Sequence, residues 1–162
     1  MRGFSFDSIL DNLPYGLLSD LKELTDLLEV RMHLELGMVE RVNKEATPDQ
    51  LQKLETVLHN MQVAAEQGEY SAADDRLFHQ LLYQNVNNDV LARILDIFWL
   101  VLRRAQDATE IPPVNPMEAF ERHRAIYQAL VEHNEAMLKQ AMQKHYSGIL
   151  TRIERFKASQ AE

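Results

Sequence analysis

The sequence predicts an all-α protein, organised as an antiparallel bundle of six or seven helices. Two observations support this fold class. Apolar residues recur at intervals of three and four over most of the chain, and no segment alternates with the period of two that is typical of a strand. Glycine and proline are scarce, at five each, and most of them fall between the helical stretches. The 162 residues contain no internal repeat and no second domain boundary.

The first expected helix runs from about 19 to about 43 and passes through Gly37. Its apolar stripe is interrupted by two charged residues, Arg31 and Glu35, which are four apart. One interpretation is an ion pair on a partly exposed helix face. The other is that Arg31 points into the bundle, where its guanidinium would bind a carboxylate ligand. The spacing alone favours neither. The stripe consists of Leu21, Leu24, Leu28, Arg31, Glu35, Met38 and Val42.

Capping residues and turns delimit the other expected helices. Thr47 is a good N-cap, Pro48 suits the first helical position, and Gln50 would complete a capping box. The helix over 89–107 is apolar almost all round, which places it at the centre of the fold or in a subunit interface. The five remaining helices are expected at about 48–68, 71–88, 89–107, 115–133 and 134–156, with Ser71 and Asn134 as N-caps of the third and the sixth helix.

Composition excludes several classes of function. The net charge is −8, from 17 basic and 25 acidic residues, which argues against a nucleic-acid-binding surface on this chain. The absence of cysteine excludes disulfides, cysteine-ligated metals and thiol nucleophiles. No run of 18 apolar residues is present, so no membrane span is expected. The N-terminus lacks the features of a signal peptide, and we expect a cytoplasmic protein.

Four polar residues lie where apolar residues are expected. Asp75 and His79 are four apart on the third helix, so their side chains share one face. His123 and His145 occupy core positions of the fifth and sixth helices. An aspartate and three histidines from adjacent helices would make a metal site, and imidazole suits Zn, Ni, Cu, Fe and Mn.

A site without metal is the competing interpretation of these residues. A histidine on an apolar stripe is commonly a hydrogen-bonded core residue, and the helix dipole alone favours an aspartate in a first turn. The other three histidines, His33, His59 and His133, have no such context and are expected on the surface.

Four segments, in order and with matching gaps, resemble the FCD domain. This is the C-terminal effector-binding and dimerisation domain of the FadR subfamily of GntR transcription regulators. The closing histidine of the pattern follows 22 residues after His123, and the pair Arg31 and Glu35 resembles an R-x-x-x-E in the family's first helix. The resemblance covers about 20–156. The four segments are Asp75-Arg76-Leu77-Phe78-His79, Asn88-Asp89-Val90-Leu91, His123-Arg124-Ala125-Ile126-Tyr127-Gln128-Ala129-Leu130 and Ala141-Met142-Gln143-Lys144-His145.

The resemblance implies a divalent ion held by one aspartate and three histidines. Those roles fall on Asp75, His79, His123 and His145. Zn or Ni is favoured, and Mn or Fe would also be accommodated. The resemblance further implies a small carboxylate effector, which Arg31 would help to neutralise, and a homodimer.

The resemblance also implies that the effector modulates DNA binding by an N-terminal winged helix-turn-helix, which this sequence does not contain. Residues 1–18 are expected to be a linker from that upstream domain, and 19–158 the ligand-binding and dimerisation domain. We expect no enzymatic activity. Two alternatives stay open: a metal-free helical dimerisation or scaffold module, and a metal-dependent hydrolase.

Overall fold

The computed structural model describes residues 21–108 and 114–160, which are helical over most of their length and contain no strand. The predicted all-α fold is therefore confirmed. Seven α-helices and one short 3-10 helix lie in these ranges. They are α2 (Leu21–Leu36), α3 (Val39–Glu45), α4 (Pro48–Glu66), α5 (Ala72–Tyr83), η1 (Gln84–Val86), α6 (Asp89–Ala108), α7 (Pro116–Val131) and α8 (Glu135–Gln160). The linker predicted over 1–18 lies outside the described residues.

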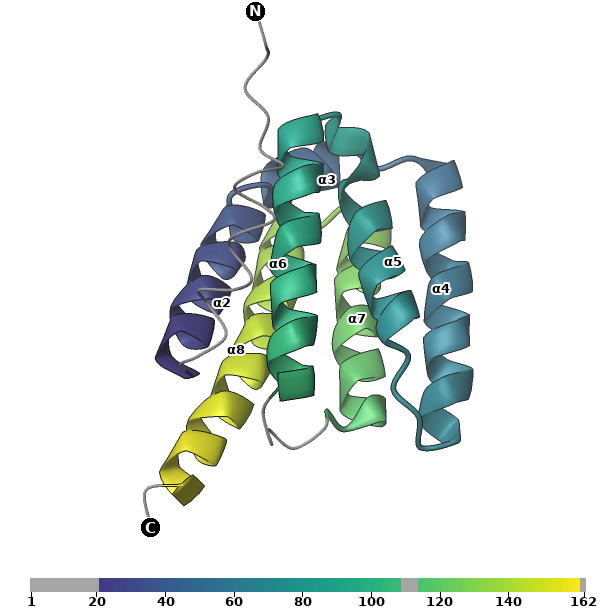
Figure 1. Ribbon diagram of the computed structural model, residues 1–162. Coiled ribbons are helices and arrows are strands. Elements are labelled where there is room, and N and C mark those ends of the chain that lie inside the picture. Colours follow the sequence, from purple (N-terminus) through teal and green to yellow (C-terminus); the bar gives the residue numbers. More distant parts are fainter. Residues whose placement is uncertain (1–20, 109–113, 161–162) are drawn as a thin grey trace, which may run out of the picture.

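Six of the helices form a closed ring. Helix α2 packs on α8, α8 on α7, α7 on α4, α4 on α5, α5 on α6, and α6 returns to α2. Their axes run roughly along one direction, and the short α3 lies near one end of the bundle (Figure 1). Side chains that point inward from α2, α5, α6, α7 and α8 therefore meet in the middle, although these helices are spread over most of the described chain.

The interior is packed mainly with aliphatic and aromatic side chains. One large cluster contains side chains from every element from α3 through α8. A smaller cluster, made of Leu24, Leu28 and Ile153, packs α2 against α8. Burial of this apolar area is the main source of stability in such a bundle. The largest fully buried apolar side chains are Tyr146, Phe78, Leu28, Leu54, Leu82, Ile126, Leu130, Leu138, Met142 and Ile153.

The prediction of one helix over about 19–43 is wrong in one respect, because the structure has two helices there. Helix α2 ends at Leu36, and α3 begins at Val39. Gly37 lies at the break, where its low helix propensity makes an interruption inexpensive. The buried stripe moves by one residue there, so that Val39 is buried while Met38 is half-buried. The change of direction lets Val39 and Val42 enter the main cluster.

The capping box predicted at the start of α4 is also wrong. Thr47 does cap the helix, since its hydroxyl accepts a bond of 3.3 Å from the Gln50 backbone N–H. The Gln50 side chain, however, is buried and its amide donates to the carbonyl oxygens of Leu81 and Leu82, at 2.7 and 3.1 Å. Its own oxygen accepts from Asn85 at 2.9 Å. Gln50 therefore joins α4 to the end of α5.

Helix α6 is not central, contrary to one of the two predictions made for it. It contacts α2 and α5 and lies between them at the front of the bundle in the view of Figure 1. One face is buried, through Leu91, Leu95, Phe98 and Val101, whereas Val90 and Leu100 are exposed. No helix in the described ranges is both long enough and apolar enough to cross a membrane.

Replacing Gln50 with alanine tests the polar link between α4 and α5. We expect Gln50→Ala to lower the free energy of unfolding by about 2 kcal/mol, because it removes the buried amide that bonds to the Leu82 carbonyl oxygen and to Asn85. Gln52→Ala, on the exposed face of the same helix, is the matched control and should change stability by less than about 0.5 kcal/mol. Chemical denaturation measures both. Equal effects would show that the Gln50 bonds contribute nothing specific.

Candidate metal centre

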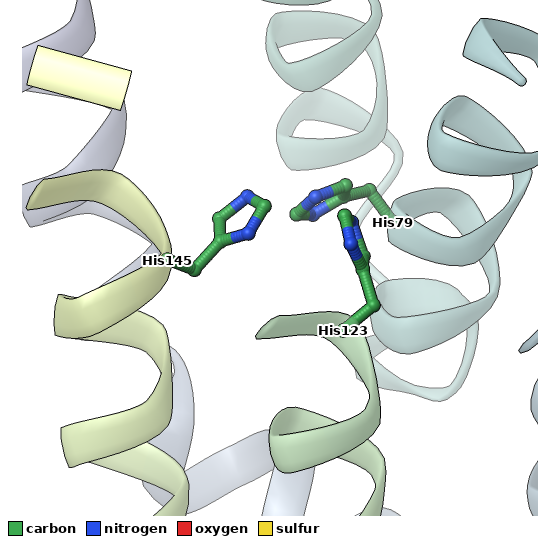
Figure 2. A group of neighbouring side chains, drawn as sticks. All are labelled: His79, His123 and His145. Carbon is green, nitrogen blue, oxygen red and sulfur yellow. The ribbon is translucent and has the colours of Figure 1, made fainter. Parts of the chain in front are cut away.

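Three histidines from three helices point at one another in the middle of the ring (Figure 2). His79 comes from α5, His123 from α7 and His145 from α8. Their ring centroids are 4.7 to 5.4 Å apart. One nitrogen of each ring lies within 4.8 Å of the corresponding nitrogens of the other two. All three side chains are buried.

Asp75 lies one helical turn before His79 and faces the same point. Its carboxylate oxygens are 3.9 Å from His79 Nε2 and 3.4 Å from His123 Nε2. The N-cap Ser71, which accepts from the Asp74 backbone N–H, starts α5 so that Asp75 falls in its first turn. The structure thus brings together all four residues predicted as metal ligands.

The hydrogen bonds around the imidazoles leave nitrogen lone pairs directed inward. His123 Nδ1 donates to the Ala119 carbonyl oxygen at 2.7 Å, which fixes the tautomer and leaves Nε2 unprotonated. His79 Nδ1 lies 3.5 Å from Glu35 Oε2. Within the described residues, His79 Nε2, His123 Nε2 and His145 Nδ1 are buried and have no hydrogen-bond partner.

These orphaned nitrogens fit a divalent ion. A metal–imidazole bond of about 2.1 Å places two ligand nitrogens at most about 4.2 Å apart. The limit of 4.8 Å observed here therefore requires only small side-chain shifts. A buried polar atom without a partner is costly, and a cation would provide the missing interaction for several such atoms at once.

The charge states of these groups also suit a cation. Burial lowers the pKa of His123, and burial together with the neighbouring imidazoles holds the pKa of His145 well below its usual range. Burial therefore favours the neutral form of both rings, which is the form that can donate a lone pair. Burial alone would raise the pKa of Asp75, but His123 and His79 outweigh it and lower the pKa, so the carboxylate stays ionised. Neutral imidazole and ionised carboxylate are the forms that bind metals.

A buried ion pair lies next to His79. Arg31 Nε donates to Glu35 Oε1 at 2.7 Å, and Tyr83 donates its hydroxyl to Glu35 Oε2 at 2.9 Å. The relative exposure of Arg31 is 5% and that of Glu35 is 0%. Burial alone would raise the pKa of Glu35, but Arg31 and His79 have the larger effect and hold this pKa well below its ordinary value. The interpretation of Arg31 and Glu35 as an ion pair is therefore confirmed, but its placement on a partly exposed helix face is wrong, because both side chains are buried.

Arg31 also lines a small cavity with the histidines, as the alternative interpretation expected. The cavity measures about 70 Å³. Trp99, the single tryptophan of the chain, forms part of its wall, and three further arginines, Arg103, Arg122 and Arg152, line it as well. By contrast, His33, His59 and His133 are exposed, as predicted.

Sequence reasoning missed several residues of this site. Tyr70 donates its hydroxyl to Asp75 Oδ2 at 2.8 Å, and Tyr83 binds Glu35 from the far end of α5. Neither tyrosine has a spacing that marks it. The arginines Arg122 and Arg152 look like ordinary exposed helix residues in the sequence. Their places on the cavity wall follow only from how α7 packs on α8.

The fold and this site together define a helical domain with a buried cluster of three histidines and one aspartate, residue types that can bind a metal ion. The FCD domain family matches residues 26–148, and the chain belongs to that family. The resemblance inferred from the motifs is thereby confirmed.

Relatives of the chain are transcription regulators. The chain is similar to the HTH-type transcriptional regulator LutR of Bacillus subtilis (strain 168), with 25% identity over 154 residues that cover 92% of this chain and 70% of LutR. It also resembles the solved structure of Streptococcus agalactiae GntR, with a TM-score of 0.72, 27% identity, and coverage of 87% of this chain and 65% of that one. E. coli McbR/YncC has a TM-score of 0.69 at 20% identity, covers 83% of this chain and 69% of that one, and supports the fold alone.

Removing one member of the buried ion pair should be strongly destabilising. We expect Arg31→Met to lower the free energy of unfolding by about 3–5 kcal/mol, because the Glu35 carboxylate is left buried without its cation. Arg41→Met is the matched control, since Arg41 and Glu45 make the same i, i+4 pair at 3.1 Å on an exposed face. The control should lose less than about 1 kcal/mol. Similar losses in both, measured by chemical denaturation, would contradict the importance of burial.

Proposed function

We propose that this chain is the ligand-sensing domain of a bacterial GntR-type transcription regulator. In this proposal it binds a divalent ion through Asp75, His79, His123 and His145, and a small carboxylate effector through the ion and Arg31. The observation that carries the proposal is the set of buried imidazole nitrogens without hydrogen-bond partners, facing an ionised carboxylate in the cavity that Arg31 lines. Its membership of the FCD family supports the same role.

A bound divalent ion would supply a Lewis acid that accepts a carboxylate oxygen of the effector. The chain's own residues would do the rest. Arg31 uses its Nε–H for Glu35, and a guanidinium carries further N–H donors that suit a carboxylate. The buried pair with Glu35 holds Arg31 in place before a ligand arrives, which reduces the cost of binding. Zn or Ni fits three imidazoles and one carboxylate best, with Mn or Fe as further candidates.

The ring of helices supplies a means of coupling. The proposed ligands come from α5, α7 and α8, while Arg31 comes from α2 and Trp99 from α6. An effector that contacts all of these helices would favour one relative arrangement over others, and such a difference in affinity is what a switch needs. We propose that a homodimer transmits the change to DNA-binding domains, with a coupling of about 1–3 kcal/mol.

Metal content tests the site directly. We expect about one Zn or Ni ion per chain after incubation with either salt and gel filtration, measured by mass spectrometry. His123→Ala and His145→Ala should each lose most of this metal, because each removes a ligand that the other three cannot replace. His59→Ala and His133→Ala, which change exposed histidines, are matched controls and should keep it. No metal in the wild-type chain would favour the metal-free scaffold.

Effector binding can be followed through the fluorescence of Trp99, since this single tryptophan lines the cavity. We expect 2-hydroxybutyrate or malate to change the emission of the metal-loaded chain and to have no effect after chelation. Arg31→Lys keeps the charge but loses the forked geometry, so it should weaken binding roughly tenfold. Arg41→Lys is the control.

Two results would contradict the proposed sensor. Binding that survives chelation would exclude the metal as part of the effector site. Hydrolysis of an ester of either acid by the metal-loaded chain would favour the hydrolytic alternative over a regulator.

A further inference from the structure

The cavity beside the histidines continues into a larger groove. Arg122 on α7 and Arg152 on α8 line the cavity of about 70 Å³, and both also line a groove of about 740 Å³ between the start of α7 and the second half of α8. Ile149 is shared in the same way. The two arginines therefore stand where the small inner space meets the outer one.

This groove is basic although the chain is acidic. Its lining includes Lys144 and Arg155 besides the two arginines, against one carboxylate, that of Glu118. The whole chain carries a net charge of −8. A local excess of positive charge on an acidic protein attracts an anion and excludes a cation.

A glycine makes room for one of these arginines. Gly148 lies in α8 and lines the groove. A Cβ atom at this position would overlap the guanidinium of Arg122, so the guanidinium rests directly against the backbone of α8. Glycine in the interior of a helix is unfavourable, and its presence here allows a side chain from the neighbouring helix to approach closely.

The two guanidiniums are only weakly neutralised. Arg122 Nη2 lies 3.2 Å from Glu118 Oε2, but the Glu118 side chain is 63% exposed, and such surface pairs contribute little. Arg152 Nε is buried and has no hydrogen-bond partner among the described residues. Burial lowers the pKa of Arg152, Tyr70 raises it, and the charge of Arg122 lowers it. The two positive charges therefore repel each other, and an anion between them would remove that repulsion.

We propose that Arg122 and Arg152 form a second anion subsite, so that the effector carries two anionic groups. One group would be the carboxylate at Arg31 and the metal ligands, and the other would lie between these two guanidiniums. A carboxylate and a phosphate suit the second position equally by their chemistry. This inference rests on the proposed function and adds to it the class of effector.

Matched pairs of acids test the second subsite in the metal-loaded chain, with dissociation constants from calorimetry. Malate and 2-hydroxybutyrate share a four-carbon 2-hydroxy acid skeleton and differ in the second carboxylate. The pair 3-phosphoglycerate and glycerate does the same for phosphate. We expect at least one dianion to bind roughly tenfold more tightly than its monoanionic partner. The pair that shows the difference identifies the second group.

Two variants should remove this preference by different means. Arg152→Gln deletes a charge, whereas Gly148→Ala deletes none and only displaces the Arg122 guanidinium. In each, we expect the dianion advantage, taken as the ratio of the two dissociation constants measured in the same variant, to fall to about twofold or less. Gly148→Ala favours the helix, so a loss of folding would not explain its effect. Arg124→Gln, on α7 outside both cavities, is the matched control and should keep the advantage.

The outcomes separate this inference from the proposed function. If the chain binds metal and monoanion but shows no preference for either dianion, the second subsite is overturned and the proposed function stands. The same holds if the preference persists in both Arg152→Gln and Gly148→Ala. If no acid binds to the metal-loaded chain, the proposed function fails and the second subsite fails with it.

Discussion

The buried carboxylate of Glu35 is the constraint on which the site depends. A charge without access to water must be satisfied locally, and here Arg31, Tyr83 and His79 surround it. These residues come from α2 and α5, so the relative position of two helices is set by one carboxylate. The orientation of the His79 ring follows from this, because its Nδ1 faces Glu35 and its Nε2 is left towards the other imidazoles. Both oxygens of the Glu35 carboxylate therefore have hydrogen-bond partners, whereas the inward-facing imidazole nitrogens of the site have none in the part of the chain that the structure describes.

The closed ring of helices explains how a few polar residues on separate helices can line one cavity. The proposed ligands come from three helices, with Asp75 and His79 both on α5, and α4 contributes core packing rather than lining residues. Three imidazoles occupy positions that would otherwise hold aliphatic side chains, at the cost of apolar burial. Such polar substitution in a core reduces stability unless a ligand compensates for it, and binding of that ligand then adds to folding stability. The same three histidines therefore affect both the folding stability of the domain and its binding of a ligand.

Much of this architecture could be predicted from the sequence, because the helices are amphipathic and their caps are conventional. Ser71 and Asn134 are the N-caps that the sequence predicts for α5 and α8, and Asn115 caps α7 in the same way. The break at Gly37 could not be predicted, since a glycine within an apolar stripe is compatible with a continuous helix and tertiary packing decides between the two. The four proposed ligands were accessible through their spacing and family resemblance. The surroundings of the site were not, because the contacts of Gln50, Tyr83 and Arg122 are made with residues on other helices, which a single sequence does not reveal.

The length of α8 has a mechanical consequence. This helix has 26 residues, and His145 lies nearer its beginning than its end. The stretch from His145 to the final residue of the helix is about 22 Å long at the usual rise per residue. A tilt of about 5° around His145 would therefore displace the far end by about 2 Å, comparable to the helix shifts seen in allosteric proteins. Because Ile153, beyond His145, packs against Leu24 and Leu28, such a tilt would move α2 as well, and the far end of α8 extends past the rest of the bundle (Figure 1).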